Sequence, residues 1–325
     1  MLDDLHKSYN AYQQALSNLA DHKVNLSYSQ NAELWAGIGM LYDRCNSLEY
    51  AEQAIISSLK LDNQSIYASE LYFRLGILFK NRRMYDNSIL CFKYILDKPP
   101  RDLKSDDILF MIGHVYESNS KEKALDVFKG ILSTTPNHAL ALQQIGWIYF
   151  QESDFVKSQE YLQKACEANE KDSYSWYLLG RSYMEAREHS QAYEAYQKSI
   201  YLDPRNPIFW GSIGLLYFSI GQYRDSLDSF SRAIHINPYS VNVWWNLGLL
   251  YEACNNQTND AIDAYDRALE IDPNNTLIAT RLEQLRKGEV SVDALSLAND
   301  IVPLHSVTAN YTAHSLLGYS KDTKK

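Results

Sequence analysis

The chain has 325 residues, of which 46% are hydrophobic and 25 are tyrosines, and this content excludes a wholly disordered protein. Its formal net charge of −9 argues against direct binding to a nucleic-acid backbone, which needs clustered lysine and arginine side chains. No apolar run approaches the roughly 18 residues of a membrane-spanning helix, and residues 1–6 lack the basic and apolar parts of a signal peptide. We therefore expect an intracellular protein that contacts neither membrane nor nucleic acid directly.

The first predicted element lies at residues 1–19, which include the segment Ala11–Leu16. We interpret it as a partial repeat that consists of a second helix only. From residue 32 onward, seven glycines recur at spacings of 37, 37, 33, 34, 34 and 34 residues. A near-constant period of this length indicates an array of similar units rather than a compact domain. The seven glycines are Gly39, Gly76, Gly113, Gly146, Gly180, Gly214 and Gly248.

The same residue types surround each glycine. In the clearest unit, large side chains stand four residues before Gly214 and three after it, so they share one face of a first helix with the glycine. An aromatic residue on a second helix follows at position 230, and a proline closes the unit at position 238. A glycine inside a helix costs roughly 1 kcal/mol relative to alanine. Its recurrence at one repeat position predicts a close approach of the two helices.

This unit resembles the tetratricopeptide repeat, a helix–turn–helix of 34 residues. The resemblance implies an all-α fold, a right-handed superhelical solenoid of tetratricopeptide repeats. We assign seven repeats to residues 32–275 and a C-terminal capping helix to residues 276–287, because terminal repeats need a polar outer face. The period is lost in residues 288–325, which we expect to form a mostly disordered tail.

In repeats of this kind the first helices line a concave face, and binding residues lie one and five positions after the tryptophan-like position. Those positions are mostly aromatic or apolar here, which suits an amphipathic helix or an extended peptide with apolar anchors. Each of these side chains has the alternative role of packing within or between repeats. The predicted peptide-binding groove residues are Phe73, Phe110, His114, Trp147, Tyr177, Arg181 and Trp245.

The sequence predicts no catalytic, metal or cofactor site. The four cysteines are far apart with no Cys-x-x-Cys pair, the histidines show no pair at metal-binding spacing, and no phosphate-binding glycine loop or nucleophile elbow occurs. The lysines and asparagines with which tetratricopeptide co-chaperones clamp a C-terminal carboxylate are missing from the groove positions. We therefore expect a non-enzymatic scaffold.

Several segments resemble, in order, one particular family: the tetratricopeptide subunit of the fungal general transcriptional corepressor, which mediates glucose repression. The resemblance covers about residues 1–287 and includes an insertion near Asn256. These segments are Ala11–Leu16, Leu41–Arg44, Glu70–Gly76, Phe92–Leu96, Gln143–Gly146, Arg205–Trp210 and Leu250–Gln257.

The resemblance implies a nuclear adaptor on chromatin that joins DNA-bound repressors to a WD40-repeat corepressor subunit and histone deacetylases. Compared with that family, we expect this sequence to begin inside a repeat, without the family's first repeats, which help to hold the WD40 subunit. The resemblance therefore supports binding to DNA-bound repressors more directly than binding to the WD40-repeat subunit. The alternative is a scaffold subunit of a different multiprotein complex, such as a ubiquitin ligase or a transport complex.

Overall fold

The computed structural model describes residues 32–288 except 46, 102, 255 and 256, together with the isolated positions Lys7, Asn10, Ala11 and Gln14. The predicted partial repeat at 1–19 and the predicted tail at 288–325 lie outside the described residues, apart from those four positions and Gly288. The described part contains fifteen bounded helices, α2 to α16, and no strand, so the predicted all-helical repeat fold is confirmed. None of these helices combines the length and apolarity needed to cross a membrane.

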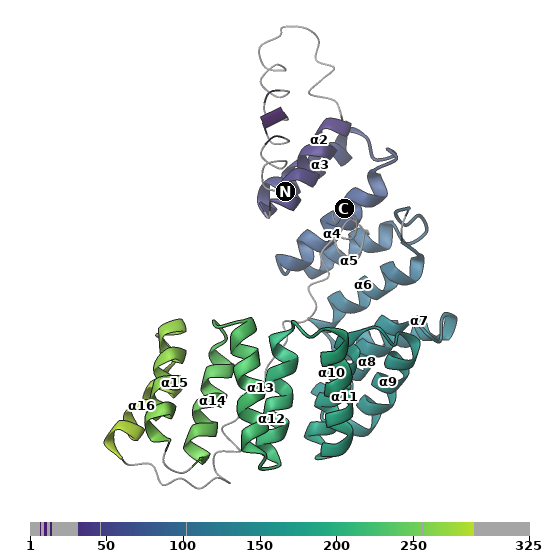
Figure 1. Cartoon of the computed structure of the whole chain (residues 1–325). Helices are drawn as coiled ribbons and strands as arrows, with labels where there is room; N and C mark the ends of the chain where they lie inside the picture. Colours follow the sequence, from purple (N-terminus) through teal and green to yellow (C-terminus); the bar gives the residue numbers. More distant parts are fainter. Residues whose placement is uncertain are drawn as a thin grey trace. The chain divides into compact units, whose positions relative to one another are not determined.

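Fourteen of the helices pack as seven consecutive pairs, one pair for each predicted repeat (Figure 1). The first helices are α2 (Ala32–Arg44), α4 (Ala68–Asn81), α6 (Ser105–Glu117), α8 (Ala139–Gln151), α10 (Ser173–Glu185), α12 (Pro207–Ser219) and α14 (Val241–Ala253). The second helices are α3 (Leu48–Leu61), α5 (Tyr85–Tyr94), α7 (Lys121–Thr134), α9 (Phe155–Ala168), α11 (His189–Leu202), α13 (Tyr223–Ile236) and α15 (Thr258–Ile271). Helix α16 (Thr276–Lys287) follows the last pair.

The described helices fall into two compact units. Unit 1 contains α2 to α7, and unit 2 contains α8 to α16. Within each unit, the second helix of one pair packs against the first helix of the next. In unit 2 the first helices α8, α10, α12 and α14 also contact one another in sequence, so they form a continuous layer. We call the surface of this layer the first-helix surface.

The repeated glycines allow the two helices of each pair to touch. A Cβ atom at position 214 would lie 2.8 Å from Cε1 of Phe230, and one at position 180 would lie 2.6 Å from Cδ1 of Tyr196. Both rings are buried. The other five repeated glycines meet an equally close side chain of the second helix. The close approach predicted from the sequence is therefore present in all seven pairs.

The tryptophan at the start of a first helix holds the turn that precedes it. The indole Nε1 of Trp210 donates a hydrogen bond to the Pro204 carbonyl at 2.9 Å, and Trp244 donates to the Pro238 carbonyl at 2.8 Å. Trp176 does the same with the carbonyl of Glu170 at 3.2 Å. The three carbonyls lie in the turns between repeats, so the recurring tryptophan links each of these turns to the helix that follows it.

Helix α16 is joined to the last helix pair of unit 2 by a largely buried charge network. The Arg281 guanidinium donates to both carboxylate oxygens of Glu252 on α14, at 3.1 and 2.7 Å, and the Tyr265 hydroxyl of α15 donates to the same carboxylate. The Glu252 side chain is fully buried. Apolar contacts of Ile278, Leu282 and Leu285 with the last pair complete the junction.

We predict that Gly214→Ala destabilises the protein by about 1–3 kcal/mol, because the added methyl group overpacks the buried Phe230 ring. Thermal unfolding followed by circular dichroism measures the effect. Gly130→Ala is the matched control, since Gly130 is an exposed position inside α7 where a Cβ meets no atom within 4 Å. The control is expected to be neutral or slightly stabilising, owing to the better helix propensity of alanine. Equal melting curves for Gly214→Ala and the parent protein would contradict the close-packing role.

Candidate functional site

The seven predicted groove residues all lie on first helices. Phe73 on α4 and the pair Phe110 and His114 on α6 belong to unit 1. Trp147 on α8, Tyr177 and Arg181 on α10, and Trp245 on α14 belong to unit 2. The structure brings Trp147, Tyr177 and Arg181 together in unit 2, and in unit 1 it places the rings of Phe110 and His114 with their centroids 6.3 Å apart.

Four predicted groove residues are buried inside their own repeats. Phe73, Phe110, Tyr177 and Trp245 expose between 0% and 3% of their surface. Each ring packs against the aromatic ring of the second helix that also contacts the repeat glycine. The centroid distances are 5.7 Å for Phe73 with Phe92, 5.6 Å for Phe110 with Phe128, 6.2 Å for Tyr177 with Tyr196 and 5.0 Å for Trp245 with Tyr265. These rings are buried against the second helices of their own repeats, and their direct contact with a peptide stays a prediction.

In unit 1, His114 lies beside a largely buried carboxyl group. Its Nδ1 is 3.5 Å from Oε2 of Glu117, and that glutamate side chain is 10% exposed. Burial raises the pKa of Glu117 to about 7, against the opposing attraction of Lys80 and Lys121. Burial also lowers the pKa of Lys80. The site at His114 is therefore a small cluster of titratable groups rather than an isolated imidazole.

In unit 2, the Arg181 guanidinium is enclosed by aromatic rings from two first helices. Its Cζ atom lies 5.3 Å from the ring centroid of Trp147, 4.9 Å from that of Phe150 and 5.9 Å from that of Tyr177. The Trp147 and Phe150 rings are stacked on each other, with their centroids 5.3 Å apart. We call Trp147, Phe150, Tyr177 and Arg181 the Arg181 cluster. Cations held over aromatic faces in this way gain roughly 0.5–2 kcal/mol per favourable contact.

Phe150 was not predicted as a site residue. The predicted groove residues lie one and five positions after the tryptophan-like position, whereas Phe150 comes one helical turn after Trp147 on α8. Residues three apart lie on the same helix face. A prediction that also included the residue one helical turn after each of these positions would have included the Phe150 ring.

The hydrogen bonding of the Arg181 cluster is incomplete. The Tyr177 hydroxyl interacts with Ser212 of α12 and with Arg181; burial is the main reason that its pKa is raised. The Nη1 atom of Arg181 and the Nε1 atom of Trp147 are buried and have no hydrogen-bond partner among the described residues. Buried polar atoms are usually paired, so two unpaired donors in one cluster require an explanation.

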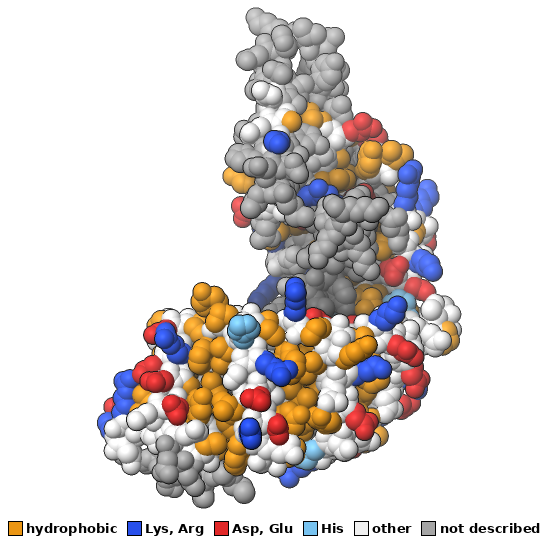
Figure 2. Space-filling model, in the orientation of Figure 1, with side chains coloured by type: hydrophobic (Ala, Val, Ile, Leu, Met, Phe, Trp, Pro, Cys, Tyr) orange, Lys and Arg blue, Asp and Glu red, His pale blue; other side chains and the backbone are white. Residues whose placement is uncertain are grey.

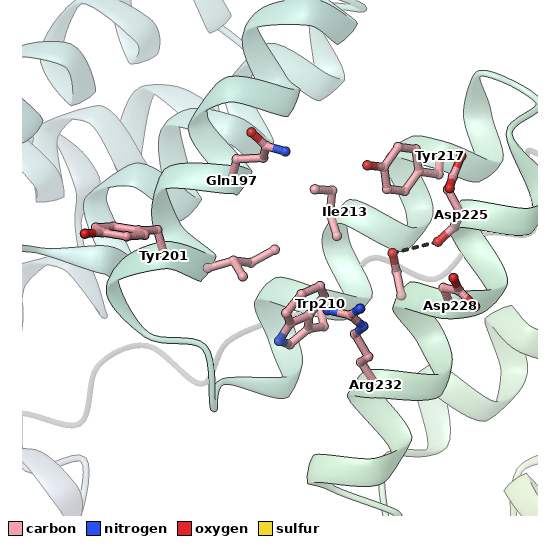
Figure 3. Close-up of a pocket in the computed structure, with 10 residues that line it drawn as sticks. Gln197, Tyr201, Trp210, Ile213, Tyr217, Asp225, Asp228 and Arg232 are labelled. Atoms are coloured by element: carbon pink, nitrogen blue, oxygen red, sulfur yellow. Dashed lines mark hydrogen bonds between the residues drawn. The ribbon is translucent and has the colours of Figure 1, made fainter.

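A second kind of surface lies between successive second helices. One pocket is lined by Gln197 and Tyr201 of α11, by Trp210 and Tyr217 of α12, and by residues of α13 (Figure 3). Among the lining residues, the Arg232 guanidinium lies 4.7 Å from the Trp210 ring centroid.

An equivalent pocket occurs one repeat earlier, where Lys198 lies 5.6 Å from the Trp176 ring centroid. Hydrophobic side chains lie in patches between charged ones on the face of unit 2 seen in Figure 2. Because these pockets recur with the repeat, they follow from its packing, and we assign them no ligand. Among the described residues, no group of three histidine, cysteine, aspartate or glutamate side chains could hold a metal ion.

Comparisons with known proteins identify the repeat and a set of relatives. Models described as tetratricopeptide repeats match residues 139–172, 173–206 and 241–275, and a TPR repeat model matches 214–253. The chain therefore contains tetratricopeptide repeats. A solved tetratricopeptide repeat protein from Parabacteroides merdae has a similar fold, with a TM-score of 0.59 and 17% identity, over 79% of this chain and 99% of that one.

The chain is similar in sequence to general transcriptional corepressors, which confirms the predicted resemblance. It is 48% identical to the general transcriptional corepressor ssn6 of Schizosaccharomyces pombe over 189 residues. It is 45% identical to the general transcriptional corepressor trfA of Dictyostelium discoideum over 188 residues. Each match covers 57% of this chain but only 16% and 13% of the two relatives, respectively. The chain thus corresponds to a small part of much longer proteins.

The buried carboxyl of Glu117 gives a pH-dependent prediction. Since its folded pKa of about 7 lies above the ordinary 4.5, the folded state keeps a proton that the unfolded state releases between these values. The stability of the parent protein should therefore fall as pH rises through this window. Glutamine has no proton to lose in this window, so Glu117→Gln should avoid up to about 3 kcal/mol of this loss in the free energy of unfolding at pH values above 7. Denaturant titrations of both proteins across the window measure the difference.

The control for this experiment is Glu122→Gln, which changes an exposed carboxylate on α7. The difference in free energy of unfolding between the parent and Glu117→Gln is expected to grow with pH. The free energy of unfolding of the control should follow that of the parent. A difference that does not change with pH would show that Glu117 is not protonated in the folded protein near neutrality.

Proposed function

We propose that this chain, whose sequence is similar to general transcriptional corepressors, acts as a non-enzymatic corepressor adaptor in the nucleus. It would link DNA-bound repressors to a WD40-repeat corepressor subunit and to histone deacetylases. The observation that carries the proposal is the identity of 45–48% to two general transcriptional corepressors over more than half of the chain.

The architecture suits this role because stacked helix pairs present an extended surface to a partner segment. In unit 2, four first helices form one layer, and the Arg181 cluster lies on two of them. We propose that repressor peptides bind across this first-helix surface. The half-buried rings of Trp147 and Phe150 would provide contact area there, because they are partly accessible to solvent.

The charge of the chain supports recruitment through proteins rather than through DNA. A net charge of −9 repels the phosphate backbone, so an adaptor of this composition needs a DNA-bound partner to reach a promoter. The proposal therefore places specificity for DNA in the repressor and specificity for the repressor in the helix array.

Tethering tests the proposal directly. The full chain is fused to a heterologous DNA-binding domain, and expression of a reporter carrying the matching site is measured. We expect several-fold repression relative to the DNA-binding domain alone. We also expect inhibition of histone deacetylases to relieve this repression. Unchanged expression with an intact, nuclear fusion protein would contradict the adaptor function.

Affinity purification of the same chain distinguishes the alternative scaffold role. The proposal predicts that a WD40-repeat corepressor, deacetylases and DNA-binding repressors are recovered and identified by mass spectrometry. Recovery of ubiquitin-ligase or transport subunits without chromatin proteins would instead place the chain in a different complex.

A further inference from the structure

We infer that the Arg181 cluster is a subsite for the carboxylate of an aspartate or glutamate side chain within a bound peptide. This inference rests on the proposed peptide binding at the first-helix surface. It adds a chemical requirement that neither the repeat pattern nor the similarity to corepressors contains.

Arg181 differs from another buried arginine of this chain in the groups that surround its guanidinium. Arg74 is 2% exposed, and its guanidinium pairs with Asp43 at 2.7 Å and with Glu70 at 2.8 Å. Arg181 is 8% exposed, yet no carboxylate lies within ion-pair distance of it in the described part of the chain. Removing a cation from water without a counter-charge is costly. The aromatic rings offset part of that cost, and a partner carboxylate would offset more.

The cluster also contains two free donors. Nη1 of Arg181 and Nε1 of Trp147 are unpaired N–H donors on side chains that contact each other, and each can donate to an anion. The neighbouring Tyr177 hydroxyl is occupied by Ser212 and Arg181. The surrounding described residues therefore supply no hydrogen-bond acceptor for these two donors.

The charge of the cluster decides which anion fits. One guanidinium neutralises one carboxylate, whereas a dianionic phosphate would keep an uncompensated negative charge beside it. Helices α12 and α14 continue the same layer beyond α10, so a bound segment has further helix surface to follow. This arrangement favours an internal acidic side chain over the end of a peptide.

Entry of the carboxylate requires a local movement. Both donor atoms are buried, while the Trp147 and Phe150 rings above them are only half-buried. A rotation of one of these rings, or of the long Arg181 side chain, brings the donors into reach. The aromatic enclosure thus holds the guanidinium in place until an acidic side chain replaces the ring contacts.

Selection from a displayed library of random peptides on the full chain tests the inference. We expect selected peptides to share an aspartate or glutamate beside an apolar residue. Selection on Arg181→Met should lose the acidic preference, whereas Arg181→Lys should keep part of it. Arg232→Met is the matched control, because Arg232 also stacks on a tryptophan but lies in the pocket between second helices. It should select the same peptides as the parent.

A resynthesised peptide then separates the possible outcomes. Replacing its acidic residue by the amide should weaken binding to the parent roughly tenfold and leave binding to Arg181→Met nearly unchanged. Melting curves of the variants show that they remain folded; methionine is expected to be neutral or stabilising at a site of unpaired charge. Loss of binding on amidation of the peptide's C-terminus would overturn the internal-side-chain assignment. Stronger binding of a phosphoserine analogue would overturn the choice of anion.

The outcome of the peptide selection distinguishes failure of this inference from failure of the proposed function. If peptides are selected without an acidic preference, or if the amide effect is the same in Arg181→Met, the carboxylate subsite is wrong while peptide binding stands. If no peptide is selected at all, binding of repressor segments to the first-helix surface is itself contradicted.

Discussion

The contact between a first-helix glycine and an aromatic or aliphatic side chain of the second helix is the constraint on which the array depends. At Gly214 and Gly180 even one additional carbon would lie within 3 Å of a buried ring. The same second-helix ring packs on the aromatic residue that follows the tryptophan-like position, as Tyr196 does on Tyr177. One close approach therefore fixes both the spacing of the helix pair and the burial of the residue next to the surface.

That consequence explains what the sequence could and could not predict. The period of the glycines was sufficient to predict the helix pairs, because the glycine, the aromatic ring and the proline each have a distinct steric role in the unit. The exposure of Phe73 and Tyr177 was not predictable from their position alone, since a ring of that size reaches either the surface or the neighbouring helix. The sequence also did not predict which turn residues adopt the left-handed backbone conformation. Gly221 signals such a turn, but Arg83, Ser153 and Arg187 adopt the same positive φ without glycine.

Charge pairing was equally invisible in the repeat pattern. Arg74, Arg181 and Arg281 all lie on helices of the array, and each side chain is at least partly buried. Arg74 and Arg281 meet carboxylates that come from neighbouring helices, whereas Arg181 meets aromatic rings. Only the three-dimensional neighbourhood distinguishes an arginine that completes the fold from one that is available to a partner. The division of the array into two units likewise depends on contacts that a regular spacing does not encode.

The network of Glu252, Arg281 and Tyr265 has a consequence for how the array comes apart. A stack of repeats ordinarily loses its terminal helix first, because that helix has a neighbour on one side only. The last described helix is α16, and its departure would leave the buried Glu252 carboxylate without the guanidinium that pairs with it. Opening of the array at α16 therefore has an electrostatic cost in addition to the loss of apolar contacts.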